Sequence, residues 1–200
     1  MTVFEIFVRL ATKFNDYLTN LFVSLNKNKY REMTVPENIK NAKSGSILLV
    51  RNSLVLKEFV NYTHALMIYT YDDVQYVITA EPIPYCEVVD INIYFKTLLT
   101  NIATVDLYEV QAPYDDKIQS KINELHDFAI NQIDKKPYEK SGIEFLYSKF
   151  HGNTSSDDKS FFCSELVVYI AQKYGIPVTG LPDNYAPDDL ARIPTIWKKL

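Results

Sequence analysis

The stretch FFCSELVVYIAQKYGI, at positions 161–176, decides how the C-terminal part of the chain folds. Apolar side chains recur in it at three- and four-residue steps, which predicts a helix with one buried face. That face consists of Phe162, Leu166, Val167, Ile170 and Ala171. Ser160 can cap the N-terminus of this helix, and Gly175 ends it. The helix therefore starts close to Cys163.

Cys163 falls in the first turn of the predicted helix. Unpaired backbone N–H groups and the helix dipole favour negative charge there, so this position lowers the pKa of a thiol. A nucleophilic cysteine needs that environment. A cysteine beside two phenylalanines in an apolar helix is also a common small core residue, so the position alone leaves both interpretations open.

Strand patterns precede this helix. Short apolar or alternating runs at 46–51, 64–70, 76–80 and 104–111 predict strands, and the turn residues at 71–73 join the second and third into an antiparallel hairpin. Helical spacing predicts a short helix within 92–102 and a long one over 115–133, which Pro137 ends. The proline-containing tail at 181–200 is expected to follow the surface, with one helical turn at 188–191. The fold class is α+β.

His64 opens the second predicted strand and is the candidate partner of Cys163. Cys and His have to be neighbours in space, not in sequence, for the imidazole to activate the thiol. On the returning hairpin strand, Glu81 is a candidate for the group that orients the imidazole, and Thr79 is the alternative. His126, beside the stripe of the long helix, is expected to be an ordinary surface or boundary histidine.

Several of these segments together resemble a known family. They are SGSILLVR at 44–51, THALMIYT at 63–70, VITAEP at 77–82, KKPYE at 135–139, FFCSELVVYIAQKYGI at 161–176 and APDDLA at 186–191. The set is similar to the YiiX/YebB-like permuted papain-fold cysteine hydrolases of the NlpC superfamily, over about residues 44–192. CSEL at the start of a long helix, with the histidine upstream on a strand, is the specific part of the resemblance.

The resemblance implies a circularly permuted papain-like fold, in which a small antiparallel sheet or barrel packs against helices. It implies that Cys163 is the nucleophile, His64 the general base, Glu81 or Thr79 the third member, and Tyr138 an aromatic residue lining the substrate pocket. No cofactor and no metal are expected. The implied reaction is hydrolysis of an amide or peptide bond, such as one in a cell-wall peptide, through an acyl-enzyme. The alternatives are a lipid-directed thiol acyltransferase or esterase, and a catalytically silent binding module.

Composition narrows the classes of partner. The chain has 200 residues, of which 47% are hydrophobic and 23% charged, and its formal net charge is −4. No long basic run occurs, so a nucleic-acid partner is not expected, because neutralising phosphates needs clustered lysine and arginine. Two cysteines, Cys86 and Cys163, are too few for a disulfide framework and have no zinc-site spacing.

The first 43 residues precede the hydrolase-like segments, which divides the chain into an N-terminal part, 1–43, and a domain, 44–200. Apolar residues at helical spacing predict an amphipathic helix over 3–25, followed by a polar connector at 26–43. The helix is expected to dock on the domain, and contact with a lipid or membrane surface is the alternative. Neither a secretory signal nor a membrane span is recognised, so the default location is cytoplasmic, or the host cell for a viral or phage product.

Overall fold

The computed structural model describes residues 32–52, 61–80, 85–98, 103–137 and 161–200. Within them, an antiparallel six-stranded sheet has the order β4-β3-β2-β1-β5-β6. The strands are β1 (Ile47–Asn52), β2 (His64–Tyr71), β3 (Val74–Ala80), β4 (Cys86–Asp90), β5 (Ala103–Val110) and β6 (Trp197–Lys199). The predicted α+β class is confirmed, and the described strands form an open sheet, not a barrel.

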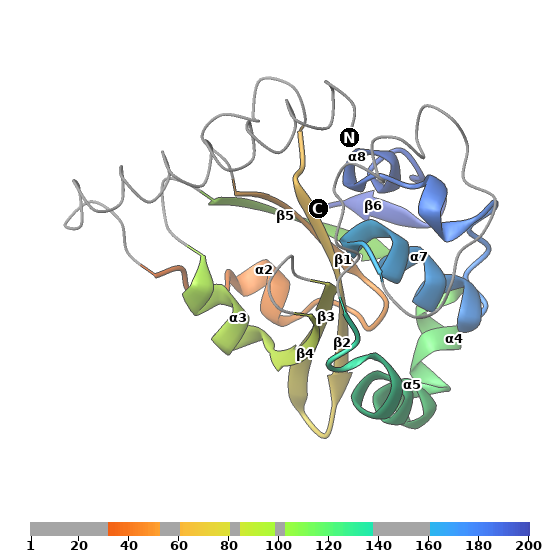
Figure 1. The fold of residues 1–200 in the computed structure, drawn as a ribbon, viewed down its shortest axis with the longest axis horizontal. Coiled ribbons are helices and arrows are strands. Elements are labelled where there is room, and N and C mark those ends of the chain that lie inside the picture. The colour runs from red at the N-terminus through yellow and green to blue at the C-terminus, as the bar shows by residue number, and fades with distance from the viewer. Residues whose placement is uncertain (1–31, 53–60, 81–84, 99–102, 138–160) are drawn as a thin grey trace.

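Helices cover both faces of the sheet, with α2 and α3 on one side and α4, α5 and α7 on the other (Figure 1). The helical elements are α2 (Glu37–Lys40), α3 (Ile91–Thr97), α4 (Tyr114–Gln119), α5 (Ile122–Phe128), the π-helical turn η2 (Ala129–Ile133), α7 (Cys163–Lys173), the 3₁₀ turn η3 (Pro182–Asn184) and α8 (Pro187–Leu190). The predicted N-terminal helix over 3–25 lies outside the described residues.

Side chains of the central strands alternate between two buried clusters. Along β2, Ala65 and Met67 belong to the cluster that also contains residues of α5 and α7. Leu66 and Ile68 belong to the second cluster, which contains residues of α2 and α3. This period of two is what a strand buried on both faces requires. Val35 of the expected connector is buried in the second cluster, and the domain boundary at 43/44 stays a prediction.

The hairpin of β2 and β3 forms at the predicted place. Asp72 and Asp73 occupy its two-residue turn, with φ of 47° and 59°. Positive φ at both central positions is the property of the tight turns that match strand twist, and aspartate tolerates it better than most residues. The predicted antiparallel hairpin is therefore confirmed.

The sequence patterns missed both edge strands of the described sheet. β4 is short and carries charges among its apolar residues, and β6 has the sequence Trp-Lys-Lys. The tail was expected to follow the surface, but Trp197 is buried and donates from Nε1 to the carbonyl oxygen of Gly45 at 2.9 Å. Edge strands are often short and charged, which discourages pairing with another chain and weakens their hydrophobic pattern.

Two helix predictions need correction. The helix expected over 115–133 is divided into α4, α5 and η2. The Ser120 hydroxyl donates to the Lys117 carbonyl at 2.9 Å, and Lys121 leaves the helical region with φ −119° and ψ 23°; such local bonds compete with the helical pattern. The helix near Cys163 has Phe162, not Ser160, at its N-cap, because Phe162 keeps extended backbone angles.

Candidate active site

Cys163 is the first residue of α7 and so lies in its first turn, where the sequence predicted it. The carboxylate of Glu165, in the same first turn, accepts a hydrogen bond from the backbone N–H of Phe162 at 3.0 Å. This contact satisfies the amide at the N-cap and fixes where the helix begins. Cys163 itself is buried, with 7% of its surface exposed, so the thiol is held within the packed start of the helix.

His64 is the first residue of β2, and its imidazole contacts Thr79 of β3. The distance between His64 Nε2 and Thr79 Oγ1 is 2.7 Å, and Thr79 is fully buried. A buried hydroxyl at this distance restricts the orientation of the ring, and its donor or acceptor role depends on the tautomer. Thr79 was the alternative to Glu81 as the orienting group; Glu81 lies outside the described residues.

α7 packs against β2 and β3. Cys163 belongs to the same buried cluster as Ala65 and Ala80, the chain neighbours of His64 and Thr79. Alternation along the strands assigns His64 and Thr79 to the opposite face, that of Leu66. As the first residue of β2, His64 lies at the end of the strand.

Cys86 has a different environment from Cys163. It opens β4 opposite Ala80 and is fully buried. Burial raises the pKa of Cys86 to about 12, and the negative charge of Glu165 adds to the rise, although Lys136 works against it. Because the thiolate is the reactive form of cysteine, Cys86 is unsuited to act as a nucleophile.

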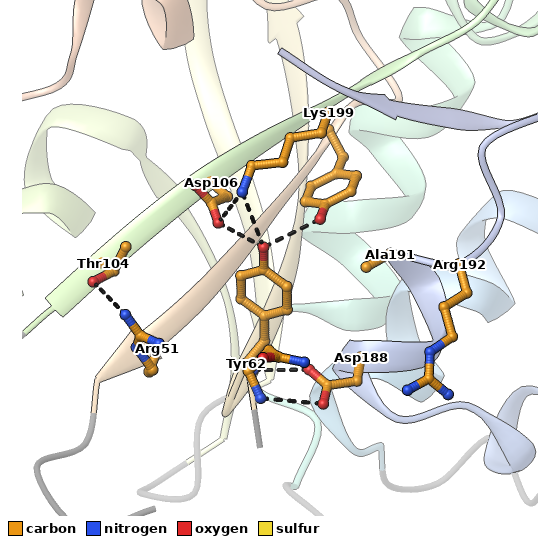
Figure 2. A pocket seen from close by; sticks show the side chains of 10 residues that line it. Arg51, Tyr62, Thr104, Asp106, Asp188, Ala191, Arg192 and Lys199 are labelled. Atoms are coloured by element: carbon orange, nitrogen blue, oxygen red, sulfur yellow. Dashed lines mark hydrogen bonds and ion pairs between the residues drawn. The ribbon is translucent and has the colours of Figure 1, made fainter. Parts of the chain in front are cut away.

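Asp188 of α8 holds the segment that leads into β2. Its carboxylate accepts hydrogen bonds from the backbone N–H of Asn61 at 3.2 Å and of Tyr62 at 2.8 Å. Figure 2 shows both contacts at the lower end of the Tyr62 side chain. Two bonds from one carboxylate restrict the backbone two residues before His64. Asp188 therefore connects α8 to the placement of the candidate base.

A polar network continues from Tyr62 across the sheet. The Tyr62 hydroxyl donates to Asp106 Oδ2 at 2.5 Å, and Lys199 Nζ lies 2.7 Å from the same oxygen (Figure 2). Burial of Asp106 acts to raise its pKa, but the hydrogen bonds from Lys199 and Tyr62 outweigh this effect and hold the pKa below its ordinary value. Burial and the bond to Asp106 raise the pKa of Tyr62, so its hydroxyl stays protonated. The network ties β5, β6 and the segment before β2 together.

Sequence reasoning did not single out this network. Asp188 belongs to the APDDLA segment that was quoted for the family resemblance, but it was given no role of its own. Tyr62 and Asp106 were ordinary strand-region residues, and Lys199 lay in the tail. Tyr62 is 44 residues from Asp106 and 137 residues from Lys199, so no local spacing could have connected these three.

Two other expectations concern the substrate pocket and metals. Tyr138 lies outside the described residues; the neighbouring Pro137 forms a bridge with Tyr85. A search of the described part of the chain for three or more His, Cys, Asp or Glu side chains that could hold a metal ion found no such group. No helix in the same residues has the length and apolar character needed to cross a bilayer.

Comparisons with known proteins give a likeness in structure only. No protein-family model matches the chain. No curated protein matches it in sequence either. Among solved structures, the crystal structure of the metalloprotein yiiX from Escherichia coli O157:H7 matches with a TM-score of 0.43 and 14% identity, covering 67% of each chain. The chain is similar to this YiiX protein, which carries the name of the family that its motifs resemble.

Proposed function

We propose that the protein is a thiol-dependent hydrolase that cleaves an amide or peptide bond, with Cys163 as nucleophile and His64 as general base. The observation that carries the proposal is the 2.7 Å contact between His64 Nε2 and the buried Thr79 hydroxyl. It supplies the oriented histidine that such a reaction needs, on a strand against which the helix that begins at Cys163 packs.

The chemistry follows from these roles. In the tautomer whose Nε2–H donates to the Thr79 hydroxyl, Nδ1 is unprotonated; His64 takes the thiol proton there, and the Cys163 sulfur attacks the carbonyl carbon. The imidazolium then returns the proton to the leaving amine, and an S-acyl intermediate remains. His64 next takes a proton from water, which attacks the thioester and releases the acid and the thiol. At both steps negative charge develops on the carbonyl oxygen of the substrate. In this mechanism that oxygen lies near the backbone N–H of Cys163, at the helix N-terminus.

Thr79 differs from a carboxylate in this role because it is neutral. A hydroxyl orients the ring, but it can donate or accept and adds no charge to stabilise the imidazolium. We therefore assign Thr79 as a positioning residue with a moderate effect. Loss of one hydrogen bond of about 1 kcal/mol corresponds to roughly a fivefold lower rate.

The test of Thr79 compares two variants. Thr79→Val removes the hydroxyl and should lower kcat/KM for a reporter amide about fivefold and shift the limb of the pH–rate profile that His64 controls. Thr79→Ser keeps the hydroxyl and should restore both. Equal activity of the wild type and Thr79→Val would reject the positioning role and return Glu81 to consideration. Thermal unfolding of both variants checks that the fold is kept.

A catalytically silent binding module is the second candidate. The alternation of β2 favours it, because Ala65 and not His64 shares the face that α7 covers. In that case replacing His64 leaves the reactivity of Cys163 unchanged, and reporter amides are not cleaved. Measuring alkylation of Cys163 with and without His64 therefore separates the two functions.

The substrate class rests on the resemblance of the motifs and remains part of the proposal. Amide or peptide hydrolysis, with a cell-wall peptide as one example, is tested by screening reporter peptides against the wild type and Cys163→Ala. The lipid-directed alternative depends on the segment 1–31, which lies outside the described residues. Lipid esters belong in the same screen.

A further inference from the structure

A polar cavity lies on the face of the sheet that α7 also covers. Its volume is about 450 Å³, and it opens between the ends of β1 and β5, the segment before β2, and α8. Arg51, Asn61, Tyr62, Thr104, Asp106, Tyr108, Asp188, Ala191, Arg192 and Lys199 line it. Figure 2 shows that the labelled side chains reach it from strands and a helix that are far apart in sequence.

Both carboxylates of the cavity are already engaged. Asp106 is bound by the Lys199 ammonium and the Tyr62 hydroxyl. Asp188 accepts the backbone N–H groups of Asn61 and Tyr62. These contacts use carboxylate oxygens that would otherwise attract a cationic ligand. The pair with Asp106 also neutralises the charge of Lys199.

Arg51 has more hydrogen-bonding capacity than these contacts use. Its half-buried guanidinium donates from Nη2 to the Thr104 hydroxyl at 3.3 Å. Its charge helps to lower the pKa of Asp106, but no ion pair joins it to a carboxylate of the described residues. A guanidinium carries five N–H donors in a planar fork that fits two oxygens of one anion. The exposed Arg192 adds a second positive charge to the lining; its own pair, with Asp189, is long at 3.6 Å.

We propose that this cavity binds an oxyanion, a carboxylate or a phosphate group, with Arg51 as its principal ligand. The guanidinium of Arg51 pairs with two oxygens of the anion, and Arg192 strengthens the binding through its charge. The hydroxyl of Thr104 and the side-chain amide of Asn61 are the neutral polar groups of the lining that complete recognition. Binding requires no chemistry at Cys163, so the test of this site does not depend on the proposed hydrolase activity.

The full chain is titrated with inorganic phosphate. Binding is measured by calorimetry and by the ³¹P NMR line width of the phosphate. Arg51→Gln should weaken phosphate binding about tenfold, because it removes a bidentate charged contact. Lys198→Gln is the matched control: it removes one positive charge from the exposed neighbour of Lys199, which does not line the cavity. It should bind within about twofold of the wild type. Thermal unfolding confirms that both variants are folded.

A second arm identifies the source of the anion. An N-acetylated dipeptide with a free C-terminal carboxylate is compared with the same dipeptide amidated at its C-terminus. Binding of the acid but not of the amide, lost in Arg51→Gln, identifies a peptide carboxylate; binding of phosphate alone identifies a phosphate ligand. Failure of both probes to bind, or equal weakening by Arg51→Gln and Lys198→Gln, overturns the proposal.

Discussion

The two cysteines should differ sharply in their reaction with iodoacetamide, and the difference tests the candidate active site. Cys86 is fully buried, and its pKa is raised to about 12 from an ordinary value of 9.0. At neutral pH this leaves about a thousandfold less thiolate than an ordinary thiol has. Burial slows the reagent further, so the measured rate at Cys86 should be lower still.

Cys163 should carry essentially all of the alkylation in the folded protein. It lies in the first turn of α7, where the helix N-terminus favours a thiolate. If His64 forms an imidazolium–thiolate pair with it, the midpoint of the pH–rate curve falls below the value of about 8.5 for a free thiol. His64→Asn removes the cation and should return the midpoint toward that value.

The assay follows the mass of the two cysteine-containing peptides over time between mildly acidic and alkaline pH. Wild type, His64→Asn and a Cys86→Ala variant are compared; alanine suits position 86 because its neighbours are apolar. Cys86→Ala should leave the curve unchanged. The reasoning about burial fails if Cys86 reacts as fast as Cys163. The hydrolase proposal fails if the Cys163 midpoint is ordinary and does not respond to His64→Asn.

Further predictions concern activity and stability. Cys163→Ala should abolish cleavage of any reporter amide and His64→Ala nearly so, while Cys86→Ala leaves it intact; equal turnover by Cys163→Ala would exclude the proposed nucleophile. Trp197→Ala should lower the free energy of unfolding by about 3–5 kcal/mol in urea titrations, because it empties a buried site and frees the Gly45 carbonyl; a loss below about 1 kcal/mol would show that β6 contributes little. The pKa of Asp106 lies below its ordinary value of 3.8 in the folded protein, so its stabilising contribution is present at neutral pH and is lost as the pH falls through the folded-state pKa. Asp106→Asn should therefore flatten the acid limb of thermal stability against pH, and an unchanged limb would contradict the network with Lys199.

The sequence by itself determined the elements whose signals are local. Asp72 and Asp73 mark the β2–β3 turn because their backbone requirement is met within the turn. Helical spacing placed Cys163 in the first turn of α7, although the N-cap was assigned to Ser160 and not to Phe162. His64 was named because it opens the second strand, and Thr79 because a period of two places it on the same strand face as Glu81.

Only the tertiary structure decided how distant segments meet. β4 and β6 are strands because they pair with β3 and β5, and neither carries enough apolar periodicity to form alone. The contacts of Asp188 with Tyr62, and of Tyr62 with Asp106, join segments 126 and 44 residues apart. Local spacing describes one turn or one strand face, whereas the polar cavity and the face that α7 covers arise from strand order and register.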